Sequence, residues 1–237
     1  MNKNSLSVTT PTIESCHRIN QIDNDPAKLR LLEELGTRGT ITLQEAVENS
    51  TDGSTAVLRQ FDKQLIDEMN KIEANCLVSF ADLNVNIGGG VHPFLQLSAK
   101  EALAGAIADR AQQLFVNSAY RTIAQQLFLY NYAQSGKSEL PAARPGQSNH
   151  QSGLAIDIED AEGWQSDLEA HGWRWLSDSD PVHFDFVGDG GRDIGGTAVL
   201  AFQRLWNRHN PNEKIDEDGA FGPVTEEKLS KSPIDGF

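Results

Sequence analysis

The sequence predicts a mixed fold of helices and a few short strands, followed by a small helical C-terminal module. Three observations lead to this prediction. Apolar residues recur at helical spacing through much of residues 61–134. Two short segments near residues 156 and 184 alternate apolar and polar residues, as strands do. A Gly- and Asp-rich stretch then separates these segments from a tail with helical spacing.

The amino-acid composition favours a folded chain without a membrane span or a nucleic-acid partner. The 237 residues are enough for one ordinary domain and a small second one, and 38% hydrophobic with 23% charged residues argues against global disorder. The formal net charge of −14 repels phosphate backbones, so no nucleic-acid partner is expected. The sequence has no apolar run of about 18 residues, so no membrane span is expected. Cys16 and Cys76 are too few for a disulfide framework, which favours free thiols, with Cys76 in a core.

The first part of the chain carries no recognisable chemistry. Residues 1–24 are polar and aperiodic and are expected to form a loose arm. A short helix is predicted for 27–36, after Asp25-Pro26 and before a closing glycine, and another for 42–48.

The middle of the chain alternates helices with short strands. Residues 61–72 are predicted to be helical, and so are 98–114, where Ser98 as N-cap and Glu101 would form a capping box. Between them, the Gly-rich loop 86–91 lacks the lysine of a phosphate loop and the spacing of a dinucleotide loop, so it indicates backbone flexibility. A strand over 115–120 and a helix over 122–134 follow.

Two later segments are predicted strands with one polar face each. In 154–158 the residues Leu154, Ile156 and Ile158 share one face, which leaves Asp157 on the other. In 183–187 the phenylalanines face a core, and His183 shares the opposite face with Asp185. If these strands are neighbours, Asp157 and His183 reach the same point.

The tail is expected to be helical. Residues 188–196 read as a linker, 197–207 as a helix, and a turn at Asp218-Gly219 leads into a second helix that ends near residue 229.

His150, Asp157 and His183 are the candidate metal ligands. A catalytic zinc site has about three protein ligands of N, O or S type and one open position, and these residues supply N, O and N. The seven-residue step from His150 to Asp157 is too long for one helical face and fits a loop followed by a strand. Zinc makes water acidic enough to supply hydroxide near neutral pH, and Asp180 is the candidate base. Each candidate also has a purely structural alternative. A histidine could be an ordinary surface residue, Asp157 could be a polar residue on a half-buried strand, and Asp180-Pro181 could be only a turn.

The pattern of these residues resembles a known family. Ser148-x-His150-x-x-Gly153-x-Ala155-x-Asp157 followed by Asp180-x-x-His183, with an upstream segment Ser118-Ala119-Tyr120-Arg121-Thr122 and Gln125, is similar to the zinc D-alanyl-D-alanine carboxypeptidases and the related L-alanyl-D-glutamate endopeptidases. The resemblance covers roughly residues 90–187. One departure is that the family usually has Glu where this chain has the shorter Asp180.

The resemblance implies an α+β fold, in which helices flank a small antiparallel sheet, and a role for each residue. It makes His150, Asp157 and His183 the ligands of one zinc ion per chain, Asp180 the base, and Arg121 the group that polarises the scissile carbonyl or holds its oxyanion. Ser148, Gln125, Arg121 and Trp175 are expected to contact substrate. Trp173 and Trp175 are candidates for the pocket wall, each with plain core packing as its alternative. Asp185 is expected either to orient a ligand histidine or to face solvent.

The tail carries a second resemblance. Residues 198–205 followed by Asp218-Gly219-x-Phe221-Gly222-Pro223-x-Thr225 are similar to a peptidoglycan-binding helical repeat, with a purely structural cap as the alternative. The sequence therefore predicts an N-terminal region (1–55), a zinc peptidase domain (56–190) and a peptidoglycan-binding-like module (196–237).

The predicted function is zinc-dependent hydrolysis of a D-amino-acid-containing bond in peptidoglycan stem peptides, with peptidoglycan or muropeptides as partners. A non-catalytic cell-wall-binding protein with a structural or degenerate metal site is the main alternative, and a metallopeptidase for ordinary proteins is a third. The N-terminus has no apolar segment typical of a secretory signal. A cytoplasmic location and a non-classical route to the cell wall are both left open.

Overall fold

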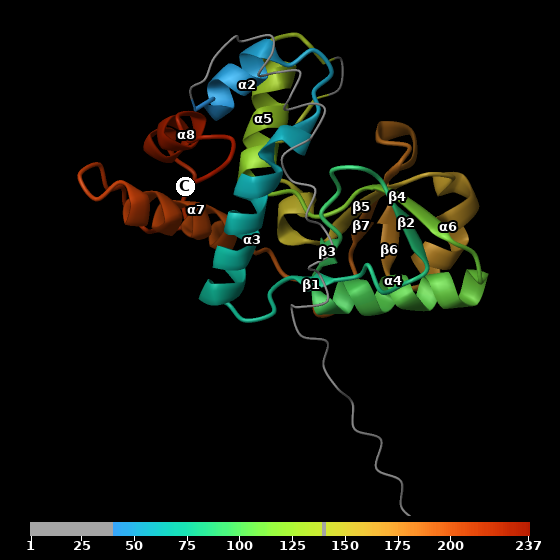
Figure 1. The fold of residues 1–237 in the computed structure, drawn as a ribbon. Coiled ribbons are helices and arrows are strands. Elements are labelled where there is room, and N and C mark those ends of the chain that lie inside the picture. Colours follow the sequence, from blue (N-terminus) through green and yellow to red (C-terminus); the bar gives the residue numbers. More distant parts are fainter. Residues whose placement is uncertain (1–39, 139–140) are drawn as a thin grey trace, which may run out of the picture.

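The chain folds into a helical layer and a sheet layer that lie side by side (Figure 1). The computed structural model describes residues 40–138 and 141–237, so the helix predicted for 27–36 lies outside the described residues. The helices are α2 (Leu43–Asn49), α3 (Arg59–Ile72), α4 (Leu97–Arg110), α5 (Ile123–Gln134), α6 (Ala161–Ala170), α7 (Gly195–His209) and α8 (Pro223–Ser230), with 3-10 turns η2 (Thr55–Leu58), η3 (Asn149–Ser152) and η4 (Ser177–Ser179). The strands are β1 (Val78–Ser79), β2 (Val85–Ile87), β3 (Phe94–Leu95), β4 (Leu114–Ser118), β5 (Ala155–Ile158), β6 (Trp173–Trp175) and β7 (His183–Phe186).

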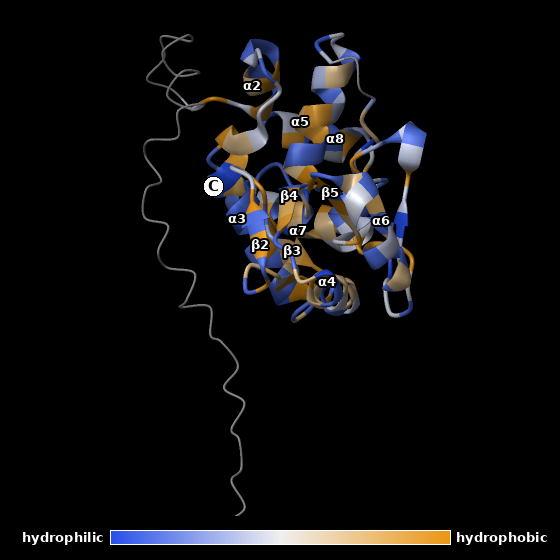
Figure 2. Cartoon of the chain, turned by 90° about the vertical axis from the view of Figure 1, so that its right-hand side faces the viewer, coloured by the Kyte–Doolittle hydropathy of each residue, from blue (hydrophilic) through white to orange (hydrophobic). Residues whose placement is uncertain are grey.

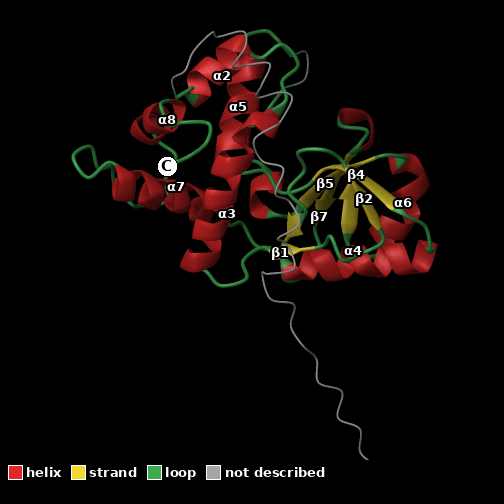
Figure 3. Ribbon diagram, in the orientation of Figure 1, coloured by secondary structure: helices red, strands yellow, loops and turns green. Residues whose placement is uncertain are grey.

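The main sheet has five strands in the order β2-β4-β5-β7-β6 (Figure 3). The pairs from β4 to β6 are antiparallel, and the edge strand β2 runs parallel to β4. β1 and β3 form a separate antiparallel pair. The α+β fold predicted from the sequence is thus confirmed, and the parallel edge strand is an addition to it.

One face of the sheet forms a core with α4 and α6. Ile156 and Ile158 of β5 and Phe184 and Phe186 of β7 are buried in this core, as their alternation predicts. Because side chains alternate across a strand, Asp157 and His183 point to the opposite face. Apolar residues are concentrated between these layers, and polar residues lie on their outer surfaces (Figure 2).

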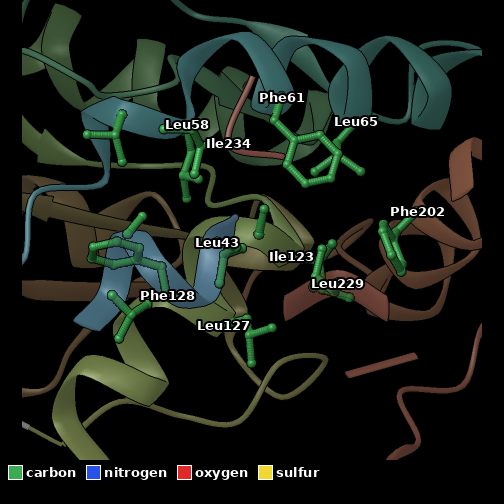
Figure 4. Packing of buried hydrophobic residues seen from close by; sticks show 14 of the residues in the cluster. Leu43, Leu58, Phe61, Leu65, Ile123, Leu127, Phe128, Phe202, Leu229 and Ile234 are labelled. Atoms are coloured by element: carbon green, nitrogen blue, oxygen red, sulfur yellow. The ribbon is translucent and has the colours of Figure 1, made fainter. Parts of the chain in front are cut away.

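The helical layer has its own core. Buried side chains from α2, α3, α5, α7 and α8 pack together, including Leu43, Phe61, Leu127, Phe202 and Leu229 (Figure 4). Residues from the predicted C-terminal module therefore share a core with helices from the other two predicted segments. The three-part division stays a prediction. No helix in the described part of the chain has the length and apolar character needed to cross a lipid bilayer.

The N-terminal caps of helices α5 and α4 show how contacts between distant segments determine where a helix begins. The helix predicted for 122–134 is α5, which begins at Ile123 with Thr122 as its N-cap, and Thr122 and Gln125 form a capping box. The predicted cap of α4 is wrong: the N-cap is Gln96, the helix begins at Leu97, and it ends at Arg110 instead of continuing to residue 114. The side chain of Gln96 donates instead to the carbonyls of Ser152 and Arg192, which fixes the helix start against distant segments.

A buried carboxylate ties the two layers together. Asp62 of α3 has 0% exposed surface, accepts a hydrogen bond from the Thr122 hydroxyl (2.5 Å), and lies 2.8 Å from Nε2 of His92. It thus clamps the loop that carries Arg121 and the loop that carries His92 onto α3.

We expect Asp62→Ala to lower the free energy of unfolding by about 3 kcal/mol, because the buried Thr122 hydroxyl and the half-buried His92 ring lose their acceptor. Urea denaturation measures this change. Asp67→Ala, an exposed position on the same helix, is the matched control and is expected to stay within about 0.5 kcal/mol of the wild type. Equal stability of the two variants would contradict the clamp.

Candidate metal centre

The register of two strands brings the first two candidate ligands together. β5 and β7 are antiparallel neighbours, and Asp157 pairs directly with His183. Side chains at directly opposed positions project from the same face and lie close together. The condition set by the sequence, that these strands be neighbours, is therefore met.

The third ligand comes from the turn before β5. His150 lies in η3, which ends at Gly153 in a left-handed conformation (φ 62°). A Cβ atom at Gly153 would lie 2.7 Å from Leu77, so glycine is required both for the conformation and for the close approach. The turn directs His150 back toward the strand that follows it.

Three donor atoms converge at this point. His150 Nε2 lies 3.2 Å from His183 Nδ1 and 3.3 Å from Asp157 Oδ1, and His183 Nδ1 lies 2.9 Å from Asp157 Oδ1. Donors about 2.0–2.1 Å from a tetrahedral zinc ion are about 3.3 Å apart. The three side chains therefore form a group that fits one such ion with a fourth position left for substrate or water.

Hydrogen bonds on the far side of each ring fix which nitrogen faces the centre. His150 Nδ1 lies 2.7 Å from the carbonyl oxygen of Ala119, so this nitrogen donates and Nε2 keeps its lone pair. His183 Nε2 lies 2.9 Å from Asp185 Oδ1. Asp185 is only 5% exposed and also accepts from Asn149 and Arg174. Of the two roles left open for Asp185, orientation of a ligand histidine is the one that the contacts support.

The same contacts set the protonation of the group. Burial and the charge of Arg121 lower the pKa of His150. Burial would also lower the pKa of His183, but hydrogen bonds to Asp157 and Asp185 raise it to about 9. Burial opposes ionisation of Asp157, yet the two neighbouring histidines and the charge of Arg121 hold its pKa well below its usual range. His150 and Asp157 are thus ready to bind a metal, whereas His183 carries a proton that a metal must displace.

Arg121 lies at the edge of this group. Its Nε donates to Ser118 Oγ (3.0 Å) and its Nη2 to Asp157 Oδ2 (2.7 Å), while Asp157 Oδ1 faces the histidines. Burial lowers the pKa of Arg121, and the charges of Asp157 and Asp180 oppose that shift. A fixed cation therefore stands beside the metal-binding group, with Asp180 near enough to interact with it.

A segment of the chain that contains these residues matches a described family. Residues 95–188 match the family model VanY, D-alanyl-D-alanine carboxypeptidase. The match confirms the resemblance seen in the sequence and indicates peptidoglycan hydrolysis of the carboxypeptidase type, and it supports hydrolase activity. It does not reach the C-terminal segment, so the peptidoglycan-binding-like module is not confirmed. The curated proteins give no significant match to the chain.

The other predicted residues of the VanY-type segment surround the centre in different ways. Asp180 follows η4, and its carbonyl accepts from the backbone N–H of His183 (3.1 Å). Ser148 directly precedes η3 and is half-buried. Gln125 accepts from the Thr122 N–H and donates to Thr55, so both ends of its amide are engaged in the fold. The roles assigned to these three residues stay predictions.

Trp173 and Trp175 lie in different environments. Trp173 is 2% exposed and packs on Phe186 with ring centroids 5.4 Å apart, so its core alternative is correct and its place in the pocket wall is wrong. Trp175 is half-buried, stacks on Phe184, and donates its indole N–H to the carbonyl of Pro181 (2.9 Å). It therefore holds the loop next to Asp180, and its contact with substrate stays a prediction.

A cleft of about 340 Å³ opens beside the centre. It is lined by Gly53, Ser54, Thr55, Ala56, Gly89, Gly90, Val91, Asn117, Ser118, Ala119, Tyr120, Arg121, Gln125, Leu129 and Asp157. The sequence prediction included Arg121, Gln125 and Asp157 among these but missed the contribution of residues 53–56, which are small or neutral and carry no motif.

We expect zinc binding at pH 7 to release about one proton, the one displaced from Nδ1 of His183. Apparent zinc affinity should therefore rise about tenfold per pH unit until the pH reaches about 9. Calorimetry in buffers of different ionisation enthalpy measures the proton count, and competition with a chelator measures the affinity. Asp185→Asn is the control, because it removes one of the two carboxylates that raise the pKa of His183. Part of this variant is then already unprotonated at His183, so zinc binding at pH 8 should release less than one proton. A pH-independent affinity between pH 6.5 and 8.5 would contradict this prediction.

The same pKa shift makes the zinc-free protein less stable at high pH. Because the folded-state pKa of His183 is raised from 6.5 to about 9, its imidazolium stabilises the fold fully below pH 6.5. That contribution, about 3 kcal/mol, is lost as the pH rises through about 9. Thermal unfolding of the chelated protein across this range measures it.

Proposed function

We propose that the protein is a zinc-dependent peptidase that hydrolyses a D-alanyl-D-alanine bond in peptidoglycan stem peptides. The observation that carries this proposal is the convergence of His150, Asp157 and His183 to within 3.3 Å of one another, inside the VanY-type segment. Arg121 beside Asp157 supports it further.

The residues of the chain have distinct roles in this reaction. Zinc supplies Lewis acidity, which polarises the scissile carbonyl and makes water a stronger acid. Arg121 provides fixed N–H donors beside the ligand group, where they stabilise the negative charge that develops on the carbonyl oxygen. Asp180, held on the turn that leads into His183, accepts the proton from the attacking water and delivers it to the leaving amine.

The proposal is tested with a stem peptide that ends in D-alanyl-D-alanine. The purified protein is expected to release D-alanine, to lose this activity after chelation, and to regain it when zinc is restored. The same peptide ending in L-alanyl-L-alanine is the control and should not be cleaved. Release of D-alanine that is unaffected by removal of all metal would disprove the zinc mechanism, and no release from the zinc-loaded protein would disprove the function.

One observation favours a second candidate, a cell-wall-binding protein with a non-catalytic metal site. Asp180 stands where the family usually has Glu, and a base with a shorter side chain can be inactive. In this case the protein would sediment with insoluble peptidoglycan and bind one zinc ion without turnover of any stem peptide.

A further inference from the structure

Almost half of the residues that line the cleft lie outside the VanY-type segment. The match begins at residue 95, whereas one wall of the cleft consists of residues 53–56 and 89–91. The other lining residues are 117–121, Gln125, Leu129 and Asp157. The cleft thus joins Arg121 and Asp157 of the candidate metal centre to a wall that lies outside the matched segment.

This wall is fixed before any ligand binds. Ser54 caps η2, and the hydroxyl of Thr55 accepts a hydrogen bond from the side chain of Gln125 (3.0 Å). Gly88 donates to the carbonyl of Val116 (2.9 Å), and His92 pairs with Tyr120 in an isolated bridge. A preformed wall contributes to affinity because little conformational freedom is lost on binding.

The chemistry of the lining favours peptide backbone. Arg121 and Asp157 are the only charged side chains among the lining residues, and both belong to the metal centre. The remainder offers hydroxyl and amide groups from Ser54, Thr55 and Asn117 and the backbone of Gly89 and Gly90, beside apolar surface from Ala56, Val91, Ala119 and Leu129. Neutral donors and acceptors pair with backbone N–H and C=O groups, and the volume of about 340 Å³ lies at the small end of ligand sites, which suits a short peptide stretch and not a glycan strand.

We propose that residues 53–56 and 89–91 form a subsite for the backbone of one or two substrate residues next to the scissile bond, so that the enzyme prefers longer stem peptides to short ones. This inference rests on the proposed function. The subsite would make the reaction depend on the length of the substrate peptide, which the metal centre alone cannot do because it contacts only the scissile bond.

Gly89 provides the test. It lines the cleft, a Cβ atom there would meet nothing within 4 Å, and its φ is not in the left-handed region, so Gly89→Leu fills the cleft without backbone strain. Gly222→Leu is the matched control, because Gly222 is equally open, has an ordinary φ of −102°, and does not line the cleft. Thermal unfolding and zinc content of both variants should match the wild type.

The variants are compared on a five-residue stem peptide and on acetyl-D-alanyl-D-alanine. We expect Gly89→Leu to lose at least tenfold in kcat/KM on the long peptide and less than twofold on the short one, while Gly222→Leu stays within twofold on both. Equal kcat/KM of Gly89→Leu and wild type on the long peptide would overturn the subsite, and so would an equal loss on both peptides.

A direct binding measurement separates this inference from the proposed function. If the wild type cleaves neither peptide, the proposed function fails, and the dissociation constant of the long peptide is then measured with the zinc-loaded protein. At least tenfold weaker binding by Gly89→Leu than by Gly222→Leu supports the subsite even then. Equal binding by the two variants, or no binding by the wild type, overturns it.

Discussion

Substitution of His183 by alanine is expected to remove zinc from the protein and to abolish D-alanine release. His183 Nδ1 lies within 3.2 Å of both other donors, so its loss leaves only one nitrogen and one carboxylate. The substitution also leaves Asp157 and Asp185 without the imidazole that both of them contact. Elemental analysis after gel filtration measures bound zinc, and the stem-peptide assay measures activity.

A graded control comes from the residue behind this ligand. Asp185→Asn leaves all three donors in place and changes only the group that orients His183, so zinc affinity should fall by roughly 10–100-fold without being abolished. The expected order of zinc affinity is wild type, then Asp185→Asn, then His183→Ala. One tightly held zinc ion in His183→Ala would contradict the proposed ligand set.

The ligands were predictable because strand alternation is a local property. The alternation in residues 154–158 and 183–187 placed Asp157 and His183 on polar faces, and both faces are as predicted. That β5 and β7 are neighbours, and that Asp157 pairs with His183, depends on packing between distant segments. Periodicity alone carries no information about that pairing.

Errors arose where distant contacts override local signals. Ser98 followed by Glu101 is a sound local capping signal, but the contacts of Gln96 with Ser152 and Arg192 start α4 earlier. The strand β6 and the helix α6 were not predicted, although Trp164, Leu168 and Trp173 are buried against the rest of the sheet core. A helix with few apolar residues and a three-residue strand produce weak periodic signals.

The cleft was the least predictable part of the site. Its wall at residues 53–56 and 89–91 consists of glycines and other small residues far from the motif in sequence, and it becomes recognisable only when η2 packs against α5. Motifs identify the residues that perform the chemistry, because those residue types are restricted. They do not identify walls, which are defined by shape and can be built from many residue types.

Asp180→Asn is expected to lower kcat by roughly 100–10,000-fold while zinc content stays at the wild-type level. Asparagine has nearly the shape of aspartate but cannot accept a proton at neutral pH. The loop itself should be unchanged, because it is held by the backbone hydrogen bond from His183 to the Asp180 carbonyl and by the indole of Trp175 on Pro181. Single-turnover kinetics with the stem peptide measure the change, and wild-type kcat in Asp180→Asn would assign proton transfer to another group.

Asp180→Glu tests whether charge or reach is the essential property. Glutamate is one methylene longer and is the residue that the family usually has at this place, so we expect kcat within about tenfold of the wild type. Both carboxylates also preserve the charge that Asp180 places near Arg121, which asparagine removes. Activity in the glutamate variant but not in the asparagine variant would therefore show that a carboxylate is required here and that the turn between η4 and β7 tolerates either length. Loss of activity in both variants, with zinc retained, would instead show that this turn is adjusted to the shorter side chain, and that the departure from the family's usual residue is compensated by the backbone.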